Sequence, residues 1–265
     1  MSNKNLQPKD FELETSTVWS FRHRGKWATH SSKFRGNWAP QVVRNILLRY
    51  SEEGDYIIDP MVGSGTTLIE AKLTGRNSLG VDINHEAIEI TKKALEFDGT
   101  NSVKCKVKLG DARKLDFLED ESVDLITLHP PYANMVEYSH KEIDEDLSSI
   151  EDIEEFYSEM GVVAKELHRI LKPNKYCAVL MGDTRKNKHY IPLAFNVMQE
   201  FLKVGFVIKE NVIKHQWNTK THGFWAKRSK KYNFLLILHE NLFIFRKLGK
   251  NESAEKIKYS KYHSS

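Results

Sequence analysis

The sequence predicts an α/β fold, with a doubly wound, mostly parallel sheet and helices on both of its faces. Apolar β-type runs alternate with amphipathic helical patterns along most of the chain, and this alternation is typical of parallel strands joined by crossover helices. Polar or glycine-rich turns follow several of these runs, at the positions where doubly wound folds bind ligands. The 265 residues are 40% hydrophobic, which is enough to fill a large core.

The elements follow one another in a regular order. A helix is predicted over 40–50, PQVVRNILLRY, because Pro40 stands at a first-turn position that proline favours. The last apolar stretch, 233–247, favours a C-terminal hairpin around His239–Asn241. Between them the patterns predict strands at 55–60, 77–83, 103–110, 123–130, 176–183 and 206–214, and helices at 66–73, 85–97, 153–172 and 191–204.

Charge is unevenly distributed along the chain. Lysine and arginine outnumber aspartate and glutamate by nine to three in residues 1–50 and by fourteen to four in 203–265, whereas the middle carries seventeen against twenty-nine. Basic ends of this kind indicate contact with a polyanion. We expect a basic N-terminal segment over 1–50, an α/β domain over 51–248 that includes a basic loop at 214–232, and a mobile basic tail over 249–265.

The composition also excludes several classes of protein. Cys105 and Cys177 cannot form a disulfide framework and lack metal-ligand spacing, and no histidine pair has the HExxH pattern, so we expect no metal. The N-terminus lacks the apolar core of a signal peptide. No apolar run approaches the ~18 residues that span a bilayer. We therefore expect a cytoplasmic protein with no membrane partner.

The first candidate site is the turn 59–67, DPMVGSGTT. Glycines between a strand and a helix allow the backbone to approach a ligand closely. The turn lacks the lysine of a phosphate-binding P-loop and the third glycine of the dinucleotide pattern GxGxxG. A nucleoside site and a purely structural turn both fit this spacing.

Two acidic residues stand at the ends of later strands. Asp82 follows Asp59 by 23 residues, close to the separation of about 20 at which an acidic residue binds a ribose diol. Asp111 follows the next apolar run, and alone it favours an ordinary turn over a ligand contact. Beside the glycine turn, Asp82 favours a nucleoside ligand.

The fourth motif is the tetrapeptide His129-Pro130-Pro131-Tyr132, at the end of another predicted strand. The two prolines remove backbone donors and leave carbonyl acceptors. The tyrosine ring offers a stacking face for a flat ring. Together these groups suit a receptor for the exocyclic amine of a base, but the motif in isolation favours a Pro-Pro turn beside a core tyrosine.

In this order and spacing, the four motifs resemble the S-adenosylmethionine-dependent amino-methyltransferases of DNA, which act on cytosine N4 or adenine N6. The resemblance covers about residues 30–246 and implies a Rossmann-like methyltransferase fold, with 51–248 as the catalytic domain. It also implies S-adenosylmethionine as the cofactor, double-stranded DNA with a flipped target base as the substrate, and a restriction-modification setting.

The resemblance assigns roles to individual residues. Segment 34–40, FRGNWAP, is similar to the segment that closes over the methionine end of the cofactor in this family. The tetrapeptide His129-Pro130-Pro131-Tyr132 corresponds to the catalytic motif. The implied cofactor-binding residues are Phe34, Asn37, Pro40, Asp59, Pro60, Gly63, Ser64, Gly65, Thr66, Asp82 and Asp111.

His129 departs from the Asp, Asn or Ser that the family usually has at this position. A neutral histidine nitrogen can accept a hydrogen bond from an amine, whereas an imidazolium cannot. The stretch after the tetrapeptide, 133–139, resembles the cytosine-N4 members more than the adenine-N6 members. We therefore favour cytosine N4 over adenine N6, with the flipped base stacked on Tyr132 and its amine held by His129 and the Pro130 carbonyl.

No separate recognition domain is evident, so DNA would be read by loops, and a homodimer is one way for such a chain to grip it. The stretch 214–232, KHQWNTKTHGFWAKRSKKY, interleaves cations with aromatic rings, which suits phosphate contacts and base stacking. A solvated basic loop with core aromatics is the alternative. The candidate nucleic-acid contacts are Lys214, Lys220, Trp225, Lys227, Arg228 and Lys230.

Other functions remain open. An RNA methyltransferase acting on a guanine amine uses similar Pro-Pro-Tyr chemistry, and a protein-glutamine methyltransferase also does, although the basic ends argue against the latter. A catalytically silent nucleic-acid-binding partner subunit would bind without turnover. A purely structural α/β module requires all four motifs to be coincidences.

Overall fold

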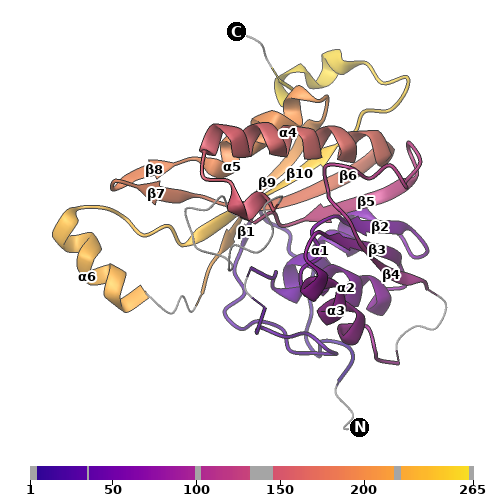
Figure 1. Cartoon of the computed structure of the whole chain (residues 1–265), viewed down its shortest axis with the longest axis horizontal. Coiled ribbons are helices and arrows are strands. Elements are labelled where there is room, and N and C mark those ends of the chain that lie inside the picture. Colours follow the sequence, from indigo (N-terminus) through magenta and orange to yellow (C-terminus); the bar gives the residue numbers. More distant parts are fainter. Residues whose placement is uncertain (1–4, 35, 99–102, 132–145, 218–221, 263–265) are drawn as a thin grey trace.

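The computed structural model of the chain describes residues 5–34, 36–98, 103–131, 146–217 and 222–262. Its centre is an eight-stranded sheet in the order β1-β9-β10-β6-β5-β2-β3-β4 (Figure 1). All neighbouring strands in it are parallel except β10, which is antiparallel to both β6 and β9. The strands are β1 (Val18–Trp19), β2 (Tyr56–Asp59), β3 (Asn77–Asp82), β4 (Cys105–Leu109), β5 (Val123–Leu128), β6 (Leu171–Gly182), β9 (Val207–His215) and β10 (His239–Arg246).

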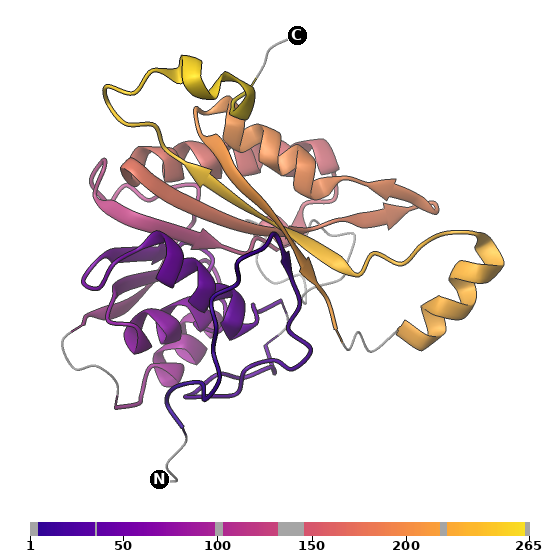
Figure 2. The ribbon, with the colours of Figure 1, turned by 180° about the vertical axis from the view of Figure 1, so that it is seen from behind.

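Helices cover both faces of this sheet, so the predicted doubly wound fold is confirmed. Three of them pack on one face and two on the other (Figure 2). The first group is α1 (Pro40–Tyr50), α2 (Thr66–Leu73) and α3 (His85–Ala94), and the second is α4 (Ile153–Ile170) and α5 (Leu193–Lys203). Local signals set several helix starts, since Pro40 is the first residue of α1 and the Asn84 side chain accepts a hydrogen bond from Glu86 N–H at α3.

The central strands are apolar on both faces because helices cover both. In β10, Phe243 and Phe245 pack in the core beside α4 and α5, whereas Leu242 and Ile244 pack in the core beside α1. A strand buried on both faces reads as an uninterrupted apolar run rather than an alternating one. The run LFIF is therefore the expected pattern for a central strand.

The N-terminal segment belongs to the same body as the sheet. Val18 and Trp19 form β1, which adds to the edge of the sheet beside β9. Trp19 and Trp38 are buried with α1 in one core cluster. The sequence predicts no strand here, because a strand of two residues is too short to show a period.

The predicted turn around His239–Asn241 is wrong. These residues begin β10, a single uninterrupted strand whose Glu240 pairs with Gly182 and with Lys214. Three consecutive polar residues are typical of a turn in a sequence. In the structure they form the first part of β10, at the end of the strand away from LFIF. A hairpin does occur in the C-terminal half of the chain, formed by β7 (Thr184–Lys186) and β8 (His189–Ile191).

Two further segments differ from expectation. The predicted basic loop 214–232 begins inside β9 and ends as the helix α6 (His222–Tyr232), which Ala, Lys and Arg favour locally. The tail, expected to be mobile, contains the 3₁₀ helix η2 (Ala254–Ser260), which contacts β9. Arg246 Nη1 donates to Glu252 Oε2 at 2.7 Å and ties the start of the tail to β10.

Candidate functional site

A cavity of about 380 Å³ opens where β2, β3 and β5 end, the edge at which doubly wound sheets bind ligands. Pro40, Asp59 and Gly65 are not among its lining residues, and Tyr132 and Lys220 lie outside the described residues. The predicted site residues that line the cavity are Phe34, Asn37, Pro60, Gly63, Ser64, Thr66, Asp82, Asp111, His129, Pro130 and Pro131.

The first part of the wall is the turn between β2 and α2. Gly63 and Gly65 have φ values of 51° and 80°, in the left-handed region that favours glycine. A Cβ atom on Gly65 would lie 2.7 Å from Cγ2 of Thr91, and the Thr91 hydroxyl donates to the Gly63 carbonyl at 2.9 Å. Close packing against α3 therefore fixes the turn whose backbone lines the cavity.

Asp82, the last residue of β3, joins two neighbouring turns. Its Oδ2 accepts the Gly63 N–H at 2.8 Å, and its Oδ1 accepts the Asn84 N–H at 2.9 Å. Burial raises the pKa of this carboxyl, and the two hydrogen bonds offset part of that rise. Both oxygens are thus fixed on the cavity wall, where a ligand hydroxyl can also donate to them.

Asp59 lies behind the turn. Its Oδ2 accepts the Thr67 hydroxyl at 2.5 Å and its Oδ1 accepts the Met61 N–H at 3.1 Å. Burial raises its pKa to about 7. Through these hydrogen bonds Asp59 stabilises the start of α2.

Asp111 belongs to a row of charged groups. Arg113 donates from Nη2 to Asp111 Oδ2 at 2.6 Å and from Nη1 to Glu159 Oε2 at 2.6 Å. The hydrogen bond to Asp111 raises the pKa of Arg113 most strongly, and the hydrogen bond to Glu159 raises it further, although partial burial opposes both. Because the guanidinium engages both Asp111 oxygens, less acceptor capacity is left for a ligand.

The N-terminal segment closes one side of the cavity. Phe34, Asn37 and Trp38 line it, and the Asn37 side-chain amide donates to the Ser64 hydroxyl at 3.0 Å. A Cβ on Gly63 would stand 3.1 Å from the Phe34 ring. The glycine turn and the closing segment therefore fit closely against each other.

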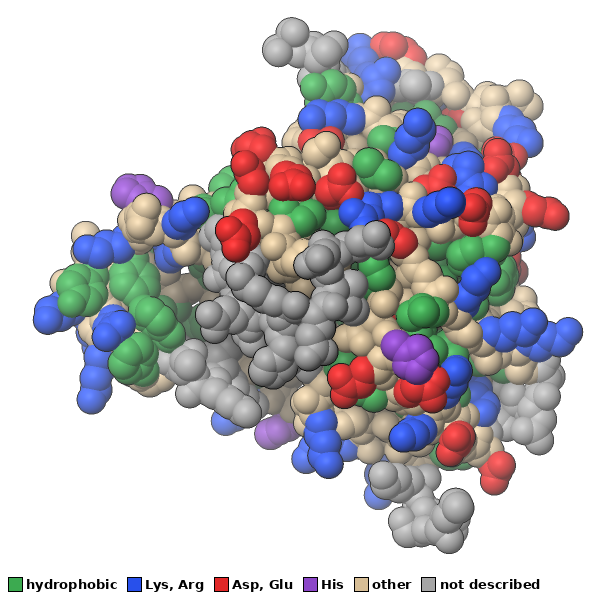
Figure 3. Space-filling view, in the orientation of Figure 1, with side chains coloured by type: hydrophobic (Ala, Val, Ile, Leu, Met, Phe, Trp, Pro, Cys, Tyr) green, Lys and Arg blue, Asp and Glu red, His purple; other side chains and the backbone are tan. Residues whose placement is uncertain are grey.

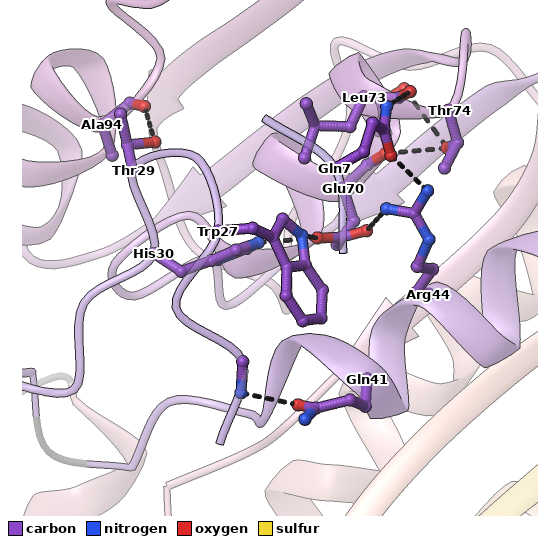
Figure 4. Close-up of polar contacts among 12 residues, drawn as sticks. Gln7, Trp27, Thr29, His30, Gln41, Arg44, Glu70, Leu73, Thr74 and Ala94 are labelled. Carbon is purple, nitrogen blue, oxygen red and sulfur yellow. Dashed lines mark hydrogen bonds and ion pairs between the residues drawn. The ribbon is translucent and has the colours of Figure 1, made fainter. Parts of the chain in front are cut away.

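A buried glutamate anchors this segment to the helix layer (Figure 4). Glu70 of α2 has a fully buried side chain. Its Oε1 accepts Trp27 Nε1–H at 2.6 Å and lies 2.6 Å from His30 Nε2, while its Oε2 accepts Arg44 Nη1–H at 3.0 Å. Sequence reasoning missed this cluster, because its members come from three separate segments.

The described part of the tetrapeptide lies at the end of β5. The His129 ring packs edge-on against Trp38, with ring centroids 5.7 Å apart and an angle of 67° between the planes. His129 Nε2 lies 3.5 Å from Glu240 Oε1, and Lys214 Nζ donates to Glu240 Oε2 at 2.6 Å. Residues from four separate segments thus meet beside the cavity.

This contact changes the environment of Lys214, a predicted nucleic-acid contact. Its side chain is 16% exposed and that of Glu240 only 5%. Burial alone would raise the pKa of Glu240, but Lys214 and His129 together lower it far below its usual range. Glu240 is therefore held ionised, and the Lys214 ammonium is occupied by it.

The other described candidates for nucleic-acid binding lie on α6. This helix projects from the body beside the β7–β8 hairpin (Figure 1), and Arg185 of the hairpin donates to the Leu235 carbonyl at 3.1 Å. Basic and hydrophobic side chains gather over α6 (Figure 3), where Phe224 and Trp225 are 55% and 41% exposed. The Arg228 guanidinium lies 4.2 Å from the Phe224 ring centroid. The candidates on α6 are Trp225, Lys227, Arg228 and Lys230.

Part of the wall was missed in the sequence analysis. Asn84 and Glu86 could have been found, because Asn-His-Glu after a strand is a helix N-cap pattern. The 3₁₀ helix η1 (Leu147–Ser149) gave no signal of its own. Trp38, Met61 and Val62 also line the cavity and lie within the predicted segments 34–40 and 59–67. The lining residues that were not named as candidates include Ile83, Asn84, Glu86, Ala112, Asp146, Leu147 and Ser148.

Within the described ranges, no three His, Cys, Asp or Glu residues form a group that could hold a metal ion. Across the same residues, no helix is both long and apolar enough to cross a membrane.

The sequence matches two known family profiles. A profile described as DNA methylase matches residues 1–93 and 123–265, and a methyltransferase-domain profile matches residues 57–174. The first of these covers most of the chain.

Several curated proteins are similar to parts of the chain. The type II methyltransferase M2.DpnII of Streptococcus pneumoniae is 36% identical over 94 residues, which are 36% of this chain and 32% of that protein. The type II methyltransferase M.MjaII of Methanocaldococcus jannaschii is 35% identical over 53% of this chain and 29% of its own length. A tRNA (guanine(10)-N2)-dimethyltransferase of Methanothermobacter thermautotrophicus is 37% identical over 44% of this chain and 34% of its own length. The matched part thus spans about a third of these relatives.

Solved structures share the fold. A SAM-dependent methyltransferase of Methanosarcina mazei superposes with a TM-score of 0.54 at 20% identity, over 77% of this chain and 98% of its own. TrmN of Thermus thermophilus gives 0.53 at 17% identity, over 81% of this chain and 50% of its own. At these identities the similarity concerns the architecture of the sheet and its helices.

Proposed function

The chain belongs to the DNA methylase family, and from this premise we propose that it transfers a methyl group from S-adenosylmethionine to the exocyclic amine of a base in double-stranded DNA. The observation that carries the proposal is the position of His129-Pro130-Pro131 on the wall of the same cavity as the glycine turn and Asp82. A methyl acceptor and a nucleoside cofactor can therefore meet in one space.

The cavity fits the cofactor that the family uses. Its volume of about 380 Å³ lies in the ordinary range of small-molecule sites. Asp82 offers a fixed carboxylate for the ribose hydroxyls, and apolar Ile83 and Ala112 line the wall for a flat ring. Phe34 and Asn37 would hold the methionine end. When bound, S-adenosylmethionine supplies a methyl group activated by its sulfonium sulfur.

The residues at the end of β5 act on the base. A target base turned out of the duplex presents its amine to His129 and to the Pro130 carbonyl, which accept its two hydrogens. This orientation localises the nitrogen lone pair and directs it towards the methyl group, so that most of the rate comes from positioning. We also propose that the base stacks on Tyr132, a residue outside those that the structure describes.

We favour cytosine N4 as the methylated atom, with adenine N6 as the alternative. The support is the likeness of segment 133–139 to the cytosine-N4 members. A restriction-modification setting is consistent with the type II relatives. A homodimer stays a prediction.

We propose that the α6 helix and the β7–β8 hairpin bind the DNA duplex. Residues 222–232 and 184–191 carry seven lysines and arginines and no carboxylate, which suits a phosphate backbone. Replacing Lys227, Arg228 and Lys230 by alanine should weaken DNA binding. The logarithm of the DNA-binding constant should also fall less steeply with the logarithm of the salt concentration, by about two to three in slope, because each lost phosphate contact removes about 0.9. Lys250→Ala, on the tail, is the matched control.

An RNA substrate is the second candidate, because tRNA dimethyltransferases are among the relatives. The deciding experiment offers labelled S-adenosylmethionine with PCR-amplified duplex DNA or with unmodified tRNA transcripts, followed by nucleoside mass analysis. N4-methylcytosine or N6-methyladenine in DNA supports the proposal. Methylation confined to RNA replaces it, and cofactor binding without any transfer points to a silent partner subunit.

A further inference from the structure

Three aromatic side chains lie on one exposed side of α6. Phe224, Arg228 and Tyr232 are spaced by four residues, so they share one side of the helix, and Trp225 joins them three residues before Arg228. Phe224, Trp225 and Tyr232 are 55%, 41% and 44% exposed. These four side chains form the aromatic face of α6. Exposed rings that are bordered by charged side chains are typical of an interaction surface.

A cation lies beside two of these rings. The Cζ atom of Arg228 is 4.2 Å from the ring centroid of Phe224 and 5.4 Å from that of Trp225, both within the range of a cation–π contact. The two ring centroids are 5.3 Å apart, and the ring planes make an angle of 81°. The rings are thus held nearly perpendicular to each other, with a positive charge beside both.

Other contacts attach α6 to the β7–β8 hairpin. The Ser229 carbonyl accepts the Phe234 N–H at 3.1 Å, and the Phe234 ring lies edge-on to Trp225 with centroids 6.5 Å apart. The Arg185 guanidinium of the hairpin is 5.8 Å from the Phe234 ring centroid. The helix and the hairpin therefore project as one unit (Figure 1), and Phe224 takes part in none of these attaching contacts.

The chemistry of this unit favours a polyanion that also carries flat rings. Residues 222–232 and 184–191 hold seven cations and no carboxylate. Phosphates explain the cations but leave the exposed rings without a partner. In a duplex the base faces are stacked on one another, and only base edges and the backbone are accessible. Unpaired bases present their faces, and aromatic side chains among cations are the usual means of binding them.

We propose that the aromatic face of α6 stacks on unpaired bases of DNA, so that the chain prefers a duplex that continues into a single strand. This inference rests on the proposed function, because that function makes DNA the partner. It assigns separate roles to the two kinds of side chain, since lysines contact phosphates and rings contact bases. Every base has a face that can stack, so the preference concerns strandedness and not sequence.

Fluorescence anisotropy without cofactor measures this preference with two labelled probes. One is a duplex with a single-stranded extension of about ten nucleotides, and the other is the same DNA with the extension paired to its complement. Phosphate contacts alone would favour the fully paired probe, because a duplex has the greater charge density. The wild type should instead bind the unpaired extension more tightly, by about fivefold or more, the contribution of one stacked base.

Two substitutions of Phe224 separate stacking from apolar burial. Phe224→Leu keeps an apolar side chain but removes the ring, so the preference should disappear, whereas Phe224→Tyr keeps the ring and the preference. The salt dependence of binding should be unchanged in Phe224→Leu. Lys227→Ala should do the opposite, keeping the preference and lowering the salt slope by about 0.7, the value for one phosphate contact on a single strand.

Tyr259→Ala is the matched control. Tyr259 lies on η2, is 86% exposed and has Lys258 Nζ 5.4 Å from its ring centroid. It is thus an exposed ring beside a cation, but on another part of the chain. Its replacement should leave the affinity for both probes unchanged. An equal loss of the preference in Tyr259→Ala and Phe224→Leu would contradict a specific role of α6.

Photo-cross-linking locates the stacked base. A 5-iododeoxyuridine in the extension should react with the aromatic side chain on which it stacks, and trypsin should then release the labelled peptide 221–227, THGFWAK, which holds Phe224 and Trp225. Cross-linking confined to other peptides would overturn the proposal, as would a preference that persists in Phe224→Leu. Self-association of the wild type that Phe224→Leu abolishes would assign the aromatic face to a second copy of the chain instead.

Binding and methyl transfer distinguish this inference from the proposed function. Preference for the unpaired extension without methyl transfer to DNA would support the inference and contradict the proposed function. Methyl transfer to the fully paired probe, with no tighter binding of the extended one, would support the proposed function and overturn the inference.

Discussion

Gly63 donates its backbone N–H to Oδ2 of Asp82 at 2.8 Å, so the residue that ends β3 also fixes the turn after β2. The two halves of the candidate cofactor site therefore depend on one carboxylate. A ligand that binds Asp82 also meets a turn whose position Asp82 sets.

Replacing Asp82 by alanine should reduce S-adenosylmethionine affinity by at least about tenfold, equivalent to about 1.4 kcal/mol. The variant loses both the acceptor for the ribose and the hold on the glycine turn. Isothermal calorimetry measures the effect. Asp116→Ala is the control, because the Asp116 side chain is 69% exposed, and an unchanged affinity in Asp82→Ala would refute the ribose assignment.

Gly65→Ala should destabilise the protein more than Gly54→Ala does. Both glycines have positive φ, 80° and 86°, so each alanine costs about 1–2 kcal/mol in backbone strain. Only at Gly65 would the new methyl group meet a neighbour, Thr91 Cγ2 at 2.7 Å, whereas nothing lies within 4 Å at Gly54. Urea denaturation of the two variants measures the difference. Equal losses would mean that the turn shifts easily away from Thr91.

Glu70→Ala should unfold at a lower temperature and release the N-terminal segment. The change leaves the Arg44 guanidinium without its buried carboxylate, which typically costs about 3–5 kcal/mol. Limited proteolysis should then cut before residue 40 sooner than in the wild type, and cofactor affinity should fall because Phe34 and Asn37 lose their support.

Glu89→Gln is the control for this change, since Glu89 pairs with Lys92 on the surface with both side chains about half exposed. Its unfolding temperature should stay close to that of the wild type. A Glu70→Ala protein with wild-type proteolysis at the N-terminus would show that the segment is held by other contacts.

The stability of the wild type relative to Asp59→Asn should fall as pH rises from about 4 to about 7. Burial raises the pKa of Asp59 from 3.8 to about 7 in the folded protein. Between these values the unfolded chain releases a proton that the folded chain retains, so the contribution of the neutral carboxyl is present below pH 4 and lost as pH passes 7. Urea midpoints at several pH values measure the gap, and a gap independent of pH would contradict the shift.

Short sequence signals, such as prolines and glycines at element ends, predicted much of the fold. Pro40 and the apolar spacing after it set the helix that the structure has as Pro40–Tyr50, and the glycines after Asp59 mark the turn before Thr66–Leu73. These features depend on residues a few positions apart, where proline geometry and glycine freedom act directly. The glycine turn, Asp82 and the tetrapeptide were recognised for the same reason, because each motif is short and contiguous.

Other features were decided by the tertiary structure. Glu70 meets Trp27, His30 and Arg44 only because the segment before α1 and α1 itself both pack against α2. His239–Asn241 forms a strand because β6 and β9 pair with it on both sides.

Sequence by itself determined the fold class, the family resemblance and the contiguous motifs, since spacing within one segment records which backbone conformation that segment favours. Only the tertiary structure joined His129 to Glu240 and Glu240 to Lys214. Contacts of this kind depend on strand order and register, which bring together residues from distant segments. The physical reason is that a polar side chain in one strand does not specify its partner until the sheet is assembled and burial makes an unpaired charge unfavourable.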